Sequence, residues 1–260
     1  MRERVTVLAP AKLNLALDVV GILPGGYHAL DMTMQAISIY ERVVIRRSPY
    51  LDLTLPGSNV KPGPGNTAIK AALAFFHYTG LLAGADITIY KNVPVRAGMA
   101  GGSADAAAVL VGLNELYGAR LSMSELCALG AGIGADVPFF LHTSPAFYVG
   151  GGDVLATEYP VLPATPVVLV KPHETSISTV EAYRRFDESP VPAEKPDAIA
   201  SVLRAGDAEA AYALVHNNLG VISAQMEPRI QAVLDWLRAQ EGTVAVVVCG
   251  CLLYTSDAAD

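Results

Sequence analysis

The sequence predicts a mixed α+β fold, in which a strand-rich first part precedes a helix-richer second part. Two observations predict it. Runs that alternate apolar and polar residues, the period of a half-buried strand, concentrate before residue 56. Helical patterns with recognisable start and stop residues follow from residue 66, and they dominate after residue 196. No internal repeat or low-complexity linker stands out, so the order of elements itself indicates the class.

The elements follow from local signals. Asn66 is typical of a helix N-cap and Gly80 of a helix stop, while Ser122-x-x-Glu125 has the spacing of a capping box that begins a shorter helix. The segment 188–196 carries three prolines and several charges and is predicted to be a surface loop. We expect strands over 4–8, 13–20, 32–39, 42–46, 51–55, 85–92, 167–170 and 243–248, and helices over 68–78, 103–117, 197–204, 207–217 and 228–240.

The composition excludes several classes of function. A formal net charge of −7 argues against nucleic acid as a partner, because phosphate backbones are bound by basic surfaces. No stretch approaches the roughly 20 apolar residues of a membrane-spanning helix, and the mixed-charge N-terminus is unlike a signal peptide. Three cysteines do not make a disulfide framework for 260 residues. We expect a cytoplasmic protein that binds neither nucleic acid nor membrane, although a small phosphorylated ligand remains compatible with this charge.

The most informative stretch is a glycine-rich loop between a predicted strand and a predicted helix. Its glycines permit positive φ angles and close approach of the backbone to a ligand. Ser103 stands at the expected helix start, where free N–H groups and the helix dipole favour an anion. The loop is neither a Walker A motif nor the Gly-x-Gly-x-x-Gly of dinucleotide folds, and a tight turn without ligand is the alternative. We expect it to cradle a phosphate through Pro94, Val95, Arg96, Ala97, Gly98, Met99, Ala100, Gly101, Gly102, Ser103 and Ala104.

With three further segments in view, the sequence resembles the GHMP family of small-molecule kinases. Residues 9–15 read APAKLNL, and residues 25–31 read GGYHALD, which is similar to a Gly-Tyr-His-x-Leu signature. The glycine loop is similar to the family's ATP-binding motif, and residues 134–140, GADVPFF, to its Gly-Ala-Asp-Val-Pro segment. The match runs over most of residues 5–185. The Tyr-His pair together with Gly-Ala-Asp-Val-Pro indicates members that act on methylerythritol linked to cytidyl diphosphate, rather than on homoserine, mevalonate or galactose.

The resemblance implies a catalytic pair. Asp136 would accept the proton of the substrate hydroxyl, and Lys12 would lie beside it. Phosphoryl transfer depends mainly on positioning and on charge stabilisation, so an acidic base and a cation are the expected parts. Lys12 is also unusual in an apolar, strand-like stretch. The alternatives are a solvated charge at a strand end for Lys12 and a cap of the turn before Val137-Pro138 for Asp136.

The resemblance also implies contacts to substrate and nucleotide. A Tyr ring offers a stacking face for a base, His28 offers hydrogen bonds, and Lys91 offers a point charge for a diphosphate. Asn66 matches a position close to the adenine, although its helix-cap role is sufficient by itself. An ordinary turn would explain Tyr27-His28, and helix packing would explain Tyr183. The residues implied in substrate binding are Asn14, Tyr27, His28, Lys91, Thr179 and Tyr183, while His77, His142, His173 and His216 show no pairing in the sequence.

The implied architecture has two domains with ATP and substrate between them. Residues 1–150 would form an ATP-binding domain of the ribosomal-protein-S5-like domain 2 type, and residues 151–260 a ferredoxin-like α/β part. ATP and Mg²⁺ are the implied cofactors. Asp105 and Glu115 are acidic residues of the predicted 103–117 helix, but nothing in the sequence selects a metal ligand. The oligomeric state is left open between monomer and homodimer.

The resemblance breaks near the C-terminus. Residues 246–250 approach a third glycine motif of the family, roughly Gly-Ser-Gly-Pro-Thr, and residues 251–260 depart from it entirely. We therefore expect residues 251–260 to be non-native and the second domain to be truncated. Three functions stay open at this point. They are the cytidyl-substrate kinase, another kinase of the family of the homoserine or mevalonate type, and a catalytically inactive nucleotide-binding protein.

Overall fold

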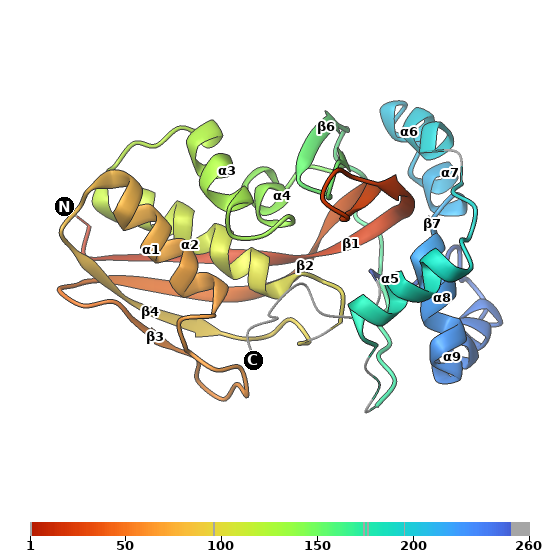
Figure 1. The fold of residues 1–260 in the computed structure, drawn as a ribbon, viewed down its shortest axis with the longest axis horizontal. Helices are drawn as coiled ribbons and strands as arrows, with labels where there is room; N and C mark the ends of the chain where they lie inside the picture. Colours follow the sequence, from red (N-terminus) through yellow and green to blue (C-terminus); the bar gives the residue numbers. More distant parts are fainter. Residues whose placement is uncertain (1, 96, 174, 176, 195, 251–260) are drawn as a thin grey trace.

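The structure is a computed structural model that describes residues 2–95, 97–173, 175, 177–194 and 196–250. Its centre is a twisted sheet with the strand order β3-β4-β2-β1-β7, to which β5 is added on β2 and β6 on β5 (Figure 1). The strands are β1 (Arg4–Ile22), β2 (His28–Ser48), β3 (Asp52–Thr54), β4 (Gly84–Tyr90), β5 (Ala146–Val149), β6 (Val154–Glu158) and β7 (His216–Asn217). The predicted α+β class is confirmed.

The first two strands are longer than the sequence pattern predicts. The structure has one strand, β1, where the sequence predicts two, over 4–8 and 13–20. It likewise has one strand, β2, in place of those predicted over 32–39 and 42–46. β1 and β2 form a long antiparallel hairpin. Pro10 lies between the two expected segments of β1 and cannot donate a ladder hydrogen bond. The register shifts between Pro10 and Ala11 instead, so a β-bulge absorbs the proline and the strand continues.

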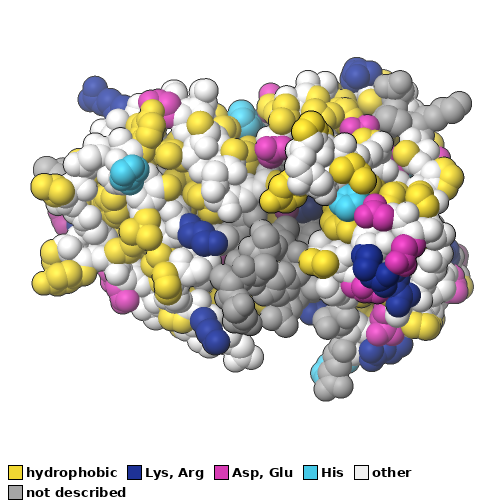
Figure 2. Space-filling model, viewed as in Figure 1, with side chains coloured by type: hydrophobic (Ala, Val, Ile, Leu, Met, Phe, Trp, Pro, Cys, Tyr) yellow, Lys and Arg dark blue, Asp and Glu magenta, His cyan; other side chains and the backbone are white. Residues whose placement is uncertain are grey.

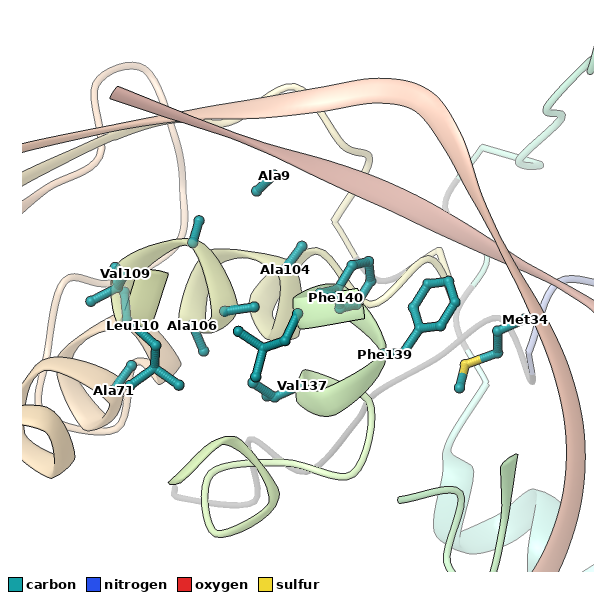
Figure 3. Packing of buried hydrophobic residues seen from close by; sticks show 14 of the residues in the cluster. Ala9, Met34, Ala71, Ala104, Ala106, Val109, Leu110, Val137, Phe139 and Phe140 are labelled. Carbon is teal, nitrogen blue, oxygen red and sulfur yellow. The ribbon is translucent and has the colours of Figure 1, made fainter. Parts of the chain in front are cut away.

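Four helices cover one face of this sheet and enclose the main core. They are α1 (Thr67–Thr79), α2 (Gly101–Tyr117), α3 (Met123–Ala131) and α4 (Val137–His142), and Figure 3 shows side chains of α2 and α4 packed under β1 and β2. The small residues of α2 allow this close approach. A Cβ added at Gly112 would lie 2.5 Å from the Cδ1 atom of Ile45, so α2 sits directly on β2.

The predicted helix ends on this face are confirmed where the signal is local. The Asn66 side chain accepts the N–H of Ala68, and Gly80 ends α1 with φ 66°. Ser122 and Glu125 form both hydrogen bonds of the capping box. The start of α2 is the exception, because the helix begins at Gly101 and not at Ser103.

The remaining helices gather at one end of the sheet (Figure 1). They are α5 (Thr179–Glu188), α6 (Pro196–Arg204), α7 (Ala208–Ala213), α8 (Asn218–Met226) and α9 (Pro228–Arg238). Figure 2 shows acidic and basic side chains together over the region of α5, where Arg184 and Arg185 pair with Glu181. No helix among the described residues is long and apolar enough to cross a membrane.

Of the predicted elements in this half, one helix is too long and two strands are wrong. The helix expected over 207–217 ends at Ala213, because the chain turns there and His216–Asn217 pairs with β1 as β7 before α8 begins. The segments 167–170 and 243–248 are apolar runs rich in valine, but neither has a ladder partner among the described residues. Such a run favours extended backbone, and a strand also needs a neighbour to pair with. The predicted non-native segment 251–260 lies outside the described residues.

Candidate active site

The glycine loop leads into α2, whose N-terminus has no side-chain cap. The chain turns at Gly98 (φ 70°) and at Ala100 (φ 53°), and α2 starts directly after. A left-handed conformation at Ala100 costs roughly 1–3 kcal/mol, a strain typical of functional loops. No side chain caps α2, whereas side chains cap α1, α3 and α5. Its first N–H groups are therefore available to an anion. Arg96, predicted in this loop, lies outside the described residues.

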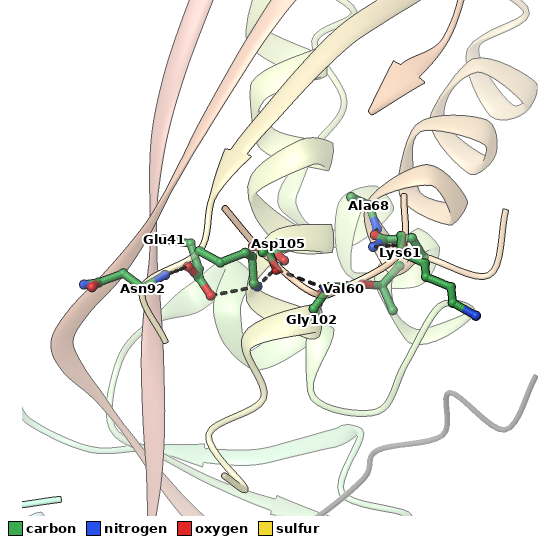
Figure 4. Close-up of polar contacts among 11 residues, drawn as sticks. Glu41, Val60, Lys61, Ala68, Asn92, Gly102 and Asp105 are labelled. Atoms are coloured by element: carbon green, nitrogen blue, oxygen red, sulfur yellow. Dashed lines mark hydrogen bonds and ion pairs between the residues drawn. The ribbon is translucent and has the colours of Figure 1, made fainter. Parts of the chain in front are cut away.

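The N-terminus of α1 abuts the same loop. The hydroxyl of Thr67 donates to the carbonyl of Gly102 over 2.7 Å. The preceding Asn66 caps α1 and also donates from Nδ2 to the carbonyl of Lys61 (Figure 4). Its helix-cap role is thus observed, and its predicted place near an adenine stays a prediction.

Lys12 is buried beside the loop rather than solvated at a strand end. It is 3% exposed, and its Nζ atom donates to Oδ1 of Asn14 over 2.9 Å. The backbone N–H of Lys12 points to the carbonyl of Met99 over 3.4 Å, which ties β1 to the loop. The solvated alternative is therefore excluded, and Lys12 lies buried beside the glycine loop.

Asp136 directly precedes α4, a short helix that shares the main core with α2. It occupies the N-cap position of α4, but its carboxylate makes no capping hydrogen bond, and the residue is only 7% exposed. Nearby, a Cβ added at Gly134 would lie 3.7 Å from the Ser103 hydroxyl, which places this segment against the glycine loop. The capping alternative is excluded, and the buried carboxylate of Asp136 stands two residues after Gly134, which faces Ser103.

The predicted substrate residues His28 and Tyr183 meet in space. Their rings stack with centroids 4.2 Å apart at an interplanar angle of 17°. The Nε2 atom of His28 is 2.8 Å from Oδ1 of Asp187, one turn along α5 from Tyr183. Tyr27 is 77% exposed, and Thr179 is the first residue of α5. The start of β2 and helix α5 thus form a shared aromatic surface.

Lys91 is held in a buried ion cluster that the sequence analysis missed. Its Nζ atom lies 2.7 Å from Oε1 of Glu41 and 2.7 Å from Oδ2 of Asp105 (Figure 4). Burial raises the pKa of Asp105 to about 7, while Lys91 opposes the rise and Glu41 adds to it. Burial alone would lower the pKa of Lys91, but the two carboxylates raise it overall. The sequence does contain one signal for this cluster, because Glu41 is a charged residue at a position of β2 that faces the protein interior. Glu115, in contrast, is exposed and pairs with Arg2.

Residues 248–250 close the loop from the C-terminal side. A Cβ added at Gly98 would lie 2.1 Å from the carbonyl oxygen of Cys249, so these backbones touch. Asn217 fixes the segment, because its Nδ2 atom donates to the carbonyls of Val248 and Gly250 over 2.7 Å each. The sequence analysis missed Asn217, since nothing local marks a contact with residues so distant in the chain.

The expectation that His142 and His216 lack pairing is wrong. Nε2 of His142 lies 3.4 Å from Sγ of Cys127, and its Nδ1 lies 3.7 Å from Glu158. Nε2 of His216 lies 2.8 Å from Oδ2 of the buried Asp18. Tertiary folding brings His142 of α4 to Glu158 of β6 and His216 of β7 to Asp18 of β1, which a sequence scan does not reveal.

The His216–Asp18 pair predicts a pH-dependent stability. Burial lowers the pKa of His216, but the hydrogen bond and charge of Asp18 outweigh it and raise the pKa overall. Its stabilisation is therefore fully present below the unfolded value of about 6.5 and is lost as the pH rises through the folded pKa. Replacing His216 by Gln, which cannot be charged, should lower the melting temperature more at pH 5.5 than at pH 8.5. An equal loss at both pH values would contradict this, and His77→Gln, on the exposed end of α1, is the control.

Comparisons with known proteins show the family to which the chain belongs. Residues 66–144 match the sequence model described as GHMP kinases N terminal domain. The chain is 38% identical over 250 residues to the 4-diphosphocytidyl-2-C-methyl-D-erythritol kinase of Pelotomaculum thermopropionicum, covering 95% of this chain and 86% of that protein. It is 44% identical over 191 residues to the enzyme of the same name from Carboxydothermus hydrogenoformans, covering 74% of this chain and 66% of that one.

A solved structure shows the same similarity in three dimensions. The crystal structure of a 4-(cytidine 5'-diphospho)-2C-methyl-D-erythritol kinase superposes with a TM-score of 0.78 at 32% sequence identity. The match covers 95% of this chain and 87% of that one.

Proposed function

Because the chain belongs to the family of 4-diphosphocytidyl-2-C-methyl-D-erythritol kinases, within the GHMP kinases, we propose that it catalyses the reaction for which that family is named. The γ-phosphate of ATP is transferred to a hydroxyl group of 4-diphosphocytidyl-2-C-methyl-D-erythritol, which gives the 2-phosphate in the non-mevalonate isoprenoid pathway. The observation that carries the proposal is the uncapped N-terminus of α2, with buried Lys12 tied to the glycine loop and buried Asp136 two residues from Gly134, which faces Ser103.

Each part of the site has a role in this reaction. The free N–H groups of α2 hold the phosphates of ATP, which the residues of the glycine loop surround. Asp136 takes the proton of the attacking hydroxyl as the new oxygen–phosphorus bond forms and ADP leaves. Lys12, fixed by Asn14, offsets the charge that develops on the transferred group. The aromatic surface of His28 and Tyr183 receives the cytosine base, with Tyr27 and Thr179 at its edge.

We also propose that Mg²⁺ accompanies the nucleotide. Among the described residues, no group of three or more His, Cys, Asp or Glu side chains could hold a metal ion. Mg²⁺ is usually held by substrate phosphates, water and one or two carboxylates rather than by a full set of protein ligands. The residues present therefore fit an ion that enters bound to ATP and neutralises phosphate charge there.

The test is ATP consumption with 4-diphosphocytidyl-2-C-methyl-D-erythritol, measured beside homoserine, mevalonate and galactose on the folded chain. Turnover with the cytidyl substrate alone is the expected result. Turnover with one of the other alcohols would show another kinase of the GHMP family. ATP binding without turnover of any substrate would support an inactive nucleotide-binding protein.

Tyr183 supplies a sharper test of the substrate site. Replacing Tyr183 by Leu removes the stacked ring and should raise the KM for the cytidyl substrate about tenfold, since base stacking on an aromatic ring contributes roughly 1–3 kcal/mol. The KM for ATP should stay unchanged. Tyr183→Phe keeps the ring and is the matched control. A rise in the KM for ATP alone would place Tyr183 outside the substrate site.

A further inference from the structure

Lys91 bridges two elements that meet at the start of α2. It follows β4, at the point where the chain leaves the sheet toward the glycine loop. Glu41 comes from the middle of β2 and is fully buried, and Asp105 comes from the first turns of α2. Figure 4 shows Glu41 and Asp105 close together, with the dashed ion-pair contacts meeting between them. The side chain of Lys91 is only 11% exposed, so its three donors are directed mainly into the protein.

The cluster also contacts the backbone of the loop. The second carboxylate oxygen of Glu41 accepts the N–H of Asn92, which fixes the chain on its way into the loop. A Cβ added at Gly101 would lie 3.3 Å from Oε1 of Glu41, so the first residue of α2 packs directly on this carboxylate. The cluster therefore touches both ends of residues 92–101, which lead from β4 to the first N–H groups of α2.

From this geometry we propose that Lys91, with Glu41 and Asp105, is a positioning residue that sets the start of α2 for the nucleotide, and that it does not contact the substrate diphosphate. The inference rests on the proposed function, because it assigns a role within that nucleotide site. An ammonium shared by two carboxylates at 2.7 Å has little remaining charge to offer a distant diphosphate.

The test measures the equilibrium Kd for ATP and the Kd for the cytidyl substrate separately in each Lys91 variant. Neither measurement requires turnover. Lys91→Met should weaken the Kd for ATP about tenfold, a change of roughly 1.4 kcal/mol, and leave the Kd for the cytidyl substrate unchanged. Lys91→Arg, whose guanidinium can also bridge two carboxylates, should restore ATP binding. The control is Lys70→Met, the same change at a partly exposed lysine of α1.

A second variant controls for a loss of folding in the first. Lys91→Met alone leaves two buried carboxylates without their cation, which is strongly destabilising. The double variant Glu41→Gln/Lys91→Met removes one charge of each sign, keeps an acceptor for the N–H of Asn92, and leaves Asp105 free to take a proton. It should fold and still bind ATP about tenfold more weakly, an effect measured as in the single variant. Unchanged ATP binding in the folded double variant, or weaker binding of the cytidyl substrate instead, would overturn the inference. A wild-type chain that binds ATP but turns over no cytidyl substrate would refute only the proposed function.

Discussion

Replacing Asp136 by Asn is expected to lower kcat by about 10²–10⁴-fold, the range for loss of a general base, while ATP binding is retained. The amide has nearly the same shape as the carboxylate, but it cannot accept the proton of the attacking hydroxyl. Asp136 makes no capping hydrogen bond that the substitution could break, so α4 should form as before. The measurement is single-turnover phosphoryl transfer together with the Kd for ATP.

Asp207→Asn is the matched control for this prediction. Asp207 also stands at an N-cap position, where it accepts the N–H of Ala210 at the start of α7, and Asn caps helices about equally well. We expect this variant to keep its full activity. If Asp136→Asn transferred phosphate at the wild-type rate, Asp136 would not be the base, and another acceptor for the proton would be needed.

Replacing Gly98 by Ala should lower the kcat/KM for ATP without unfolding the sheet. The added Cβ would meet the carbonyl oxygen of Cys249 at 2.1 Å, and backbone must shift to avoid it. The shift separates residues 248–250 from the glycine loop and displaces the residues that lead into α2. A displacement of about 1 Å in a catalytic site can lower rates by about 10²-fold, and we expect a loss of this order in kcat/KM for ATP.

The chain offers a close control for the strain itself. Gly57 has φ 69°, almost the same left-handed conformation as Gly98, but a Cβ there would meet nothing within 4 Å. Gly57→Ala should therefore cost stability by roughly 1–2 kcal/mol and leave kcat/KM for ATP unchanged. If the two variants lost equal activity, the strain of alanine and not the contact with Cys249 would be responsible.

Local signals in the sequence determined the first half of the fold well. Asn66, Gly80 and the pair Ser122–Glu125 act within a few residues of the ends they define, so their helices could be located without a tertiary context. The glycine loop could also be located from its own residues, although the sequence placed the start of α2 at Ser103 and the structure places it at Gly101. Lys12 could be singled out because a charge in an apolar strand requires a reason.

The sequence by itself therefore determined the α+β class, the caps of α1 and α3, the glycine loop, and the motifs that identify the family. Only the tertiary structure decided that β1 continues through Pro10, that residues 167–170 and 243–248 remain without ladder partners among the described residues, and that His28 stacks on Tyr183. It alone joined Lys91 to Glu41 and Asp105, and Asn217 to residues 248–250. The physical reason is the separation along the sequence between the groups that interact. A cap or a turn is stabilised by groups a few residues away, whereas strand pairing, ring stacking and buried ion pairs depend on groups that only the folded chain brings together.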